Sequence, residues 1–132
     1  MMMKILLPLF CAAGLSALAE DWPMWRHDVE RTAESPQVLK DELSLLWSRE
    51  LPRPLPAFND VRLQFDGGYE PIVKGKRLFL ASNRDDKVMA FDTNSGALLW
   101  ESFTDGPVRL APVAWRDKVL FGADDGCFYC VD

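Results

Sequence analysis

From Tyr69 onward, hydrophobic and polar positions alternate in short runs of six to eight residues. Each run is rich in β-branched, aromatic and aliphatic side chains, and turn-forming Gly, Asn, Asp or Ser residues separate most runs from the next. Runs of this length and period are typical of strands in an antiparallel meander. The pattern predicts seven strands, over residues 69–74, 77–82, 87–92, 97–104, 108–115, 118–123 and 127–132.

The predicted strands repeat as a unit. Pro71 in the first copy corresponds to Pro112 in the second, which gives a period close to forty residues. The first unit is complete over 69–104, whereas the second, over 108–132, lacks a fourth strand. Because one such unit cannot bury its own hydrophobic face, neighbouring units must stack, and two copies are too few. We therefore expect an amino-terminal fragment of a longer protein, or a chain that self-associates through its last strand if Asp132 is its end.

The chain before the repeats divides into four parts. A short positive start, a brief apolar stretch and small residues ending at Ala19 predict that residues 1–19 are a signal peptide. Residues 20–41 form an irregular Trp-rich segment, and residues 42–50 are expected to form a lone strand that starts the repeat region. Three prolines and a Gly-Gly pair make residues 51–68 a long connecting loop, a type of segment that often binds ligands.

A cleaved leader implies export to the periplasm or the medium, with no membrane span left in the mature chain. An uncleaved anchor or a buried helix is the alternative. Lipidation of Cys11 is not expected, because the bulky Phe10 precedes it. Cys127 and Cys130 could form a redox or zinc pair, but residues three apart on a strand point to opposite faces and lie about 10 Å apart. Since the only histidine is His27, we expect two ordinary strand residues.

Composition narrows the class of protein. With 48% hydrophobic and 27% charged residues, the chain is neither largely disordered nor an integral membrane protein. Its net charge of -5, with no stretch that gathers Lys and Arg, argues against a nucleic-acid partner.

Three sets of residues could carry chemistry, and each also has a simpler structural explanation. His27, beside Asp28, could act as a general base, although a surface histidine among charges is far commoner. The acidic turns at 85–86 and 124–126 lack the alternating spacing and distal Glu of a calcium loop, so we expect solvated hairpins. Four tryptophans could form a carbohydrate-stacking face, but their apolar contexts favour filling gaps between units: Trp22, Trp25, Trp47 and Trp115.

The first unit ends in a motif. Residues Ala90 to Trp100 read Ala-Phe-Asp-Thr-Asn-Ser-Gly-Ala-Leu-Leu-Trp, which resembles the Ala-x-Asp-x-x-Thr-Gly-x-x-x-Trp signature of the pyrroloquinoline-quinone-type β-propeller repeat. The resemblance implies an all-β fold of antiparallel four-stranded blades, incomplete here at about one and a half blades. It also implies that Asp92, Ser95 and Gly96 shape the turn into the outer strand, and that Trp100 docks onto the neighbouring blade. The resemblance therefore implies structural roles for these residues.

The Trp-Pro-Met-Trp-Arg run at Trp22 is similar to the start of secreted bacterial members of this family. The resemblance implies a noncatalytic exported protein that binds a protein partner through a propeller face, similar to the lipoprotein that assists outer-membrane barrel assembly. Quinone-binding relatives use calcium and often an adjacent Cys-Cys pair, which this sequence lacks, so we expect no catalytic residue, cofactor or metal. Two alternatives stay open: the amino-terminal piece of a quinone-dependent dehydrogenase, and a truncated gene product without independent activity.

Overall fold

The computed structural model describes residues 20–132, so the expected signal peptide over 1–19, with Cys11, lies outside the described residues. Two antiparallel meanders make up most of the fold, one in the order β1-β2-β3-β4 and one in the order β5-β6-β7. This confirms the all-β prediction. The elements are η1 (Val61–Leu63), a short 3-10 helix, and the strands β1 (Ile72–Lys74), β2 (Arg77–Ser82), β3 (Lys87–Asp92), β4 (Leu98–Phe103), β5 (Val113–Trp115), β6 (Lys118–Gly122) and β7 (Phe128–Val131).

The first strand of each sheet is shorter than predicted. Strand β1 begins at Ile72 rather than at residue 69, and β5 begins at Val113 rather than at residue 108. A proline precedes each strand, and proline has no N–H to donate to a ladder. Val108 nevertheless lies in the core at 1% exposure, because the linker before β5 folds back over the sheets. Between residues 20 and 132, no helix is long and apolar enough to cross a membrane.

The two units share their register. Phe79 pairs with Ala90 in the first sheet, and Leu120 pairs with Cys130 in the second, so Cys130 occupies the position that Ala90 fills. Cys127 lies just before β7, and both cysteines are free thiols. The sequence repeat is therefore also a structural repeat.

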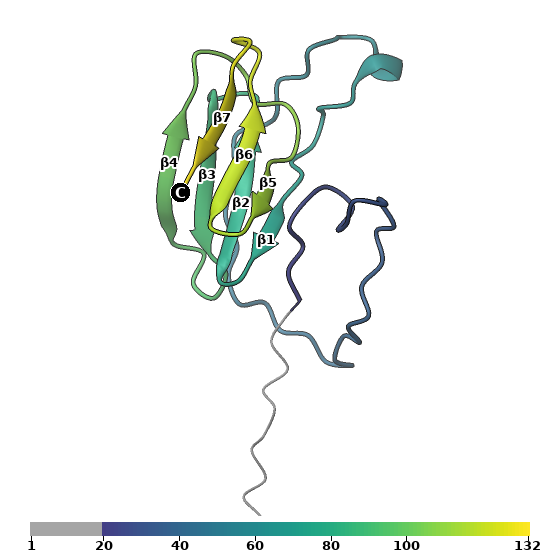
Figure 1. Ribbon diagram of the computed structural model, residues 1–132. Helices are drawn as coiled ribbons and strands as arrows, with labels where there is room; N and C mark the ends of the chain where they lie inside the picture. The colour runs from purple at the N-terminus through teal and green to yellow at the C-terminus, as the bar shows by residue number, and fades with distance from the viewer. Residues whose placement is uncertain (1–19) are drawn as a thin grey trace, which may run out of the picture.

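The two sheets stack face to face, and the main hydrophobic core lies between them (Figure 1). Alternation places one face of each strand in this core, and a fully buried Val, Leu or Phe side chain contributes about 1.5 to 3 kcal/mol. The opposite face of the first sheet is covered by the loop segment around Leu51 and by Tyr69. The shared core consists of Ile72, Phe79, Val88, Ala90, Val108, Ala114, Val119 and Phe121.

Residues 43–50 do not form the strand expected over 42–50. Instead of pairing along a sheet edge, this stretch crosses the turn between β3 and β4 and bonds to it through side chains. The Nε1 of Trp47 donates to the carbonyl of Thr93 at 2.9 Å, and the Nη1 of Arg49 donates to the carbonyl of Gly96 at 2.8 Å. The expectation was wrong because the carbonyls of this turn bind the two side chains, which holds the segment without a backbone ladder.

The turn between β3 and β4 is built by the repeat motif. The Oδ1 of Asp92 accepts from the backbone N of Asn94 at 3.0 Å and from both the N and the Oγ of Ser95 at 2.8 Å. The bonds from Ser95 hold the pKa of the Asp92 carboxyl below its usual value. Trp100 packs on the core between the two sheets, with its ring centroid 5.8 Å from that of Phe79. It therefore lies at the contact between the two units.

Two features of the structure require glycine at position 96. Its φ is +68°, a conformation that L side chains rarely adopt, and the indole of Trp47 lies directly on its Cα. A Cβ built at this position would come within 2.6 Å of the ring. The absence of a side chain thus lets Trp47 attach the segment before the repeats to the first sheet.

The outer face of the second sheet is open. Phe128 occupies the position of the fully buried Val88, yet it is 74% exposed, because no third sheet covers it among the described residues. Trp115, which was expected to fill a gap between units, belongs to the same sheet as Phe128 and is 55% exposed, so its role between units stays a prediction. An apolar face of this kind favours contact with another surface.

Gly96→Ala is expected to destabilise the chain far more than Gly75→Ala. Both glycines have positive φ, but Gly75 has open space around its Cα, so only about 1 kcal/mol of backbone strain follows there. At Gly96 the clash with Trp47 adds overpacking, for a total of about 2 to 5 kcal/mol. Urea unfolding followed by tryptophan fluorescence measures both. Equal losses would contradict the seating of Trp47 on Gly96.

The purified chain is expected to self-associate through the outer face of the second sheet. Sedimentation velocity at increasing concentration should show oligomers, and Phe128→Ser should shift them toward monomer because it removes the most exposed aromatic of that face. Leu39→Ser, at a side chain 74% exposed in the Trp-rich segment, is the control and should change little. A wild-type chain that stays monomeric at every concentration would refute the prediction.

Candidate functional site

The loop over 51–68 is anchored to the sheets by a buried carboxylate. The side chain of Asp66 is fully buried, and its Oδ2 lies 2.6 Å from the Nη1 of Arg109, in the linker between β4 and β5. The same carboxylate accepts from the backbone N of Ala57, at 3.0 Å to Oδ2. A charge without contact to water is stable only when it is paired and hydrogen-bonded, as it is here.

Arg109 connects the loop to the second sheet as well. Its Nε donates to the Oδ2 of Asp124 at 2.6 Å, in the turn between β6 and β7, and its Nη1 also reaches the carbonyl of Leu55 at 3.2 Å. The planar guanidinium holds several donors in fixed directions, which suits it to join three segments at once.

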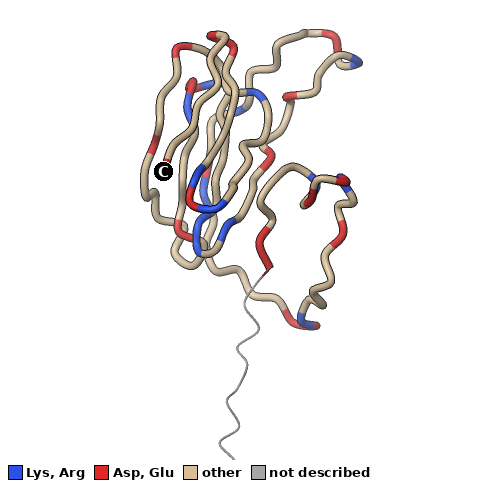
Figure 2. Tube along the Cα trace, viewed as in Figure 1, with Lys and Arg blue, Asp and Glu red and all other residues tan. Residues whose placement is uncertain are grey.

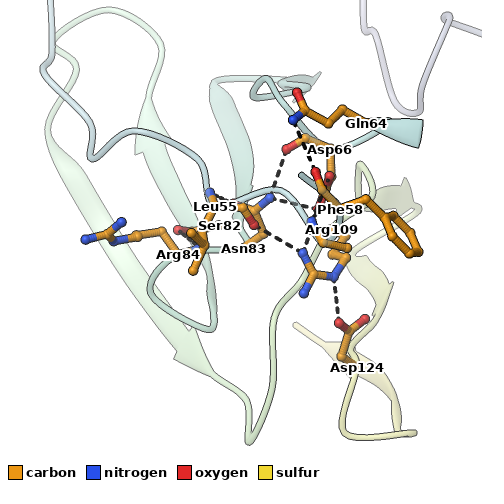
Figure 3. Close-up of polar contacts among 10 residues, drawn as sticks. Leu55, Phe58, Gln64, Asp66, Ser82, Asn83, Arg84, Arg109 and Asp124 are labelled. Carbon is orange, nitrogen blue, oxygen red and sulfur yellow. Dashed lines mark hydrogen bonds and ion pairs between the residues drawn. The ribbon is translucent and has the colours of Figure 1, made fainter. Parts of the chain in front are cut away.

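Asn83 completes the network from the turn after β2 (Figure 3). Its Nδ2 donates to the backbone carbonyl of Asp66 at 2.9 Å and to the Oδ2 of the same residue at 3.2 Å. Its Oδ1 accepts from the N of Leu55 at 3.0 Å. Both ends of the loop are thereby fixed to the same end of the first sheet.

The network determines the charge state of its members. Burial raises the pKa of the Asp66 carboxyl, but the hydrogen bonds from Arg109, Ala57 and Asn83 together outweigh it, so the pKa lies below its usual value. Burial lowers the pKa of Arg109, but its bonds to Asp66 and Asp124 outweigh that effect and leave the pKa raised. Both groups are therefore ionised at neutral pH.

Two open hollows adjoin this network and share two walls, Phe65 and Leu110. One has a volume of about 360 Å³ and the other about 290 Å³. Phe65 is 53% and Leu110 62% exposed, although each directly neighbours a member of the buried ion pair. The first hollow is lined by Trp25, Arg31, Phe65, Glu70, Leu110, Ala111 and Val113, and the second by Phe65, Arg109, Leu110, Gly122, Ala123 and Asp124.

Trp25 is one wall of the first hollow. It was expected to fill a gap between units; it is 45% exposed and lies outside the core between the two sheets, so that role stays a prediction. The Trp-rich segment is nevertheless attached to both sheets beside it. Trp22 and Val73 of β1 exchange backbone hydrogen bonds at 2.8 Å, and the carbonyl of Pro23 accepts from the N of Ala114 in β5 at 2.7 Å.

The other candidate residues lie apart from the hollows. His27 packs on Trp22, with ring centroids 4.9 Å apart, and lies 3.5 Å from a carboxylate oxygen of Glu20. In the acidic turn after β6, Asp125 accepts from the hydroxyl of Tyr129, which raises the pKa of that tyrosine to about 12. Within residues 20–132, no three His, Cys, Asp or Glu side chains are arranged to hold a metal ion.

The fold also brings basic residues together that are dispersed in the sequence. The turns β1–β2 and β5–β6 lie at the same end of the two sheets, where Figure 2 shows the blue segments gathered at the lower end. Acidic side chains lie among them: Lys74 pairs with Asp21 at 2.8 Å, and Lys118 pairs with Asp132. The basic residues at this end are Lys74, Lys76, Arg77, Arg116 and Lys118.

Sequence reasoning identified the loop but missed its anchor. The length of the 51–68 loop indicated a binding segment, whereas Asp66, Asn83 and Arg109 were not singled out. One signal was present, since Arg109 interrupts an apolar run and is the only charge between Val108 and Pro112. A lone charge at such a position requires a partner. Which carboxylate serves as that partner depends on how the loop folds back.

Two stacked antiparallel meanders with the same register, the first of which carries the repeat's turn motif, define this chain as a β-propeller repeat protein with partial blades. The chain belongs to the family described as outer membrane protein assembly factor BamB, whose model matches residues 16–132. No curated protein and no solved structure gives a significant match. The resemblance seen in the turn motif thus extends over most of the chain.

Asp66→Asn is expected to lower the free energy of unfolding by about 2 to 4 kcal/mol at neutral pH, because it leaves Arg109 without its buried counter-ion. Since the folded-state pKa of Asp66 is depressed, its contribution is complete above the ordinary value of 3.8 and is lost as the pH falls through the folded value. Wild type and variant should therefore converge in acid. Urea unfolding across this range measures the difference.

Asp60→Asn is the matched control. The pKa of Asp60 is also depressed by its partner, Arg62, but this pair is exposed to solvent. Its loss should barely alter stability at any pH. If both variants behaved alike, burial of the Asp66 carboxylate would not be the source of its effect.

Proposed function

We propose that this chain is part of a noncatalytic, exported repeat protein that binds another protein through the groove formed by the two hollows beside Phe65 and Leu110. The observation that carries the proposal is the exposure of these two apolar side chains on a backbone fixed by the buried Asp66–Arg109 pair. Apolar side chains that remain exposed next to a hollow are typical of binding surfaces.

The way the groove is held also supports binding. The backbone around it is fixed by hydrogen bonds from the turns after β2 and β6, so little ordering remains to be done when a partner arrives. The description of the family names an assembly factor of outer membrane proteins, which is in keeping with a protein-binding role. The predicted leader over 1–19 is in keeping with export.

A photo-crosslinking amino acid placed at Leu110 tests the proposal in cells that export the protein. It is expected to trap one partner. The same amino acid at Leu63 should not, because that leucine, in the 51–68 loop, is similarly exposed but lines neither hollow. The partner, identified by mass spectrometry and purified, should bind Leu110→Ser about tenfold more weakly than wild type. Leu63→Ser should leave the affinity unchanged.

Equal loss of affinity in the two variants would show that the groove is not the binding surface. Absence of any partner trapped from position 110 would also count against the proposal.

A further inference from the structure

Residues 42–50 have the pattern of a strand but no sheet to join. The apolar residues Leu43, Leu45 and Trp47 stand at every second position, as on one face of a strand. Within residues 20–132, however, this stretch makes no backbone–backbone hydrogen bond. Leu43 is 75% and Leu45 84% exposed. The stretch therefore offers a free backbone and apolar side chains at the spacing of a strand.

Strand β7 is an edge that lacks a neighbour. In the first sheet, β3 lies between β2 and β4. Strand β7 has the register of β3, yet it pairs only with β6 among the described residues. Its residues are Phe128, Tyr129, Cys130 and Val131, with no charge and no proline. Because an uncharged, apolar edge recruits further strands, β7 is suited to accept one.

The other sheet edges of the described chain are occupied or charged. Strand β1 exchanges backbone hydrogen bonds with Trp22, and the N of Ala114 in β5 donates to the carbonyl of Pro23. Strand β4 carries Glu101, whose carboxylate pairs with Lys87 at 2.6 Å. A charge on an edge strand opposes further pairing. Of the edges that the structure describes, β7 therefore accepts an added strand most readily.

The attachment of residues 42–50 favours pairing between two copies of the chain. Leu51, directly after this stretch, packs on the face of the first sheet that the second sheet does not cover. Trp47 is bound to the turn between β3 and β4 of the same sheet. The first sheet therefore lies between the attachment at Leu51 and β7 of the same chain. A second copy can present its β7 from outside, and exchange of a segment between identical chains is a low-cost route to assembly.

We infer that residues 42–47 of one copy add as a strand to the β7 edge of a second copy. The added strand takes the place beside β7 that β4 takes beside β3, so backbone hydrogen bonds form along the edge. Leu43 and Leu45 then lie on the outer face of the second sheet, beside Phe128. This contact is separate from the groove and does not rest on the proposed function. It specifies how the predicted self-association through the second sheet takes place.

Sedimentation velocity of the purified chain tests the inference with a variant of the donated segment. Replacing Ser44 and Leu45 by proline together removes a backbone donor whichever edge of the segment pairs, because neighbouring residues point their N–H groups to opposite edges. Ser44→Pro/Leu45→Pro is therefore expected to weaken self-association about tenfold or more. The control, Val38→Pro/Leu39→Pro, is also exposed but lies before the segment, and should leave self-association unchanged.

Mixing two defective variants separates strand donation from contact between like faces. The proline variant keeps an intact β7, and Phe128→Ser keeps an intact segment over 42–47. An equimolar mixture should therefore form a heterodimer at concentrations where each variant alone is monomeric. If two outer faces simply met each other, the proline variant would associate as wild type does. That result, or a mixture that stays monomeric, would overturn the inference.

Hydrogen exchange gives a readout that needs no substitution. The amides of residues 42–47 and of β7 are expected to become protected together as the concentration of wild type rises. Protection that is already complete in the monomer would place the pairing within one chain and contradict the inference. Oligomers in which residues 42–47 stay unprotected, or a wild type that is monomeric at every concentration, would contradict it as well.

Discussion

The ion pair between Asp66 and Arg109 is the interaction on which the arrangement of this chain depends. A carboxylate without solvent contact must be matched by donors, and here they come from the loop before the repeats, the turn after β2 and the linker before β5. Because Arg109 also bonds to Asp124, the same charge connects the second sheet. Removing either partner leaves the other charged and buried, so the pair is costly to break even if its net contribution to stability is small.

A second constraint acts at the other end of the sheets. Gly96 gives the turn between β3 and β4 the positive φ it needs and leaves room for the indole of Trp47. The segment over 43–50 is thus fixed by the indole of Trp47, which packs on the Cα of Gly96. The loop over 51–68, which follows it, is fixed by the buried carboxylate of Asp66. Between these two attachments, the chain around Leu51 covers the face of the first sheet that the second sheet does not reach. Leu80, Met89 and Phe91 are buried on that face.

The groove is formed where buried polar groups and exposed apolar side chains are neighbours in the chain. Polar groups with fixed directions hold the backbone at Asp66 and Arg109, and the residues next to them, Phe65 and Leu110, keep apolar side chains in solvent. In an isolated loop such side chains would collapse onto the nearest apolar surface. The buried network prevents this, and so maintains an apolar surface that a partner can cover without a large ordering cost. The groove is the surface through which we propose that the chain contacts another protein.

The sequence by itself determined the strands, their turns and the stacking of repeated units, because these follow from local alternation, turn residues and a period close to forty residues. It also determined the family, through the motif from Ala90 to Trp100. The tertiary structure alone decided how the segments outside the repeats attach. The expected strand over 42–50 became a segment held by the side chains of Trp47 and Arg49, and a carboxylate was matched with an arginine 43 residues away. Such pairings depend on how a long loop returns to the sheets, and no local period in the chain encodes that path.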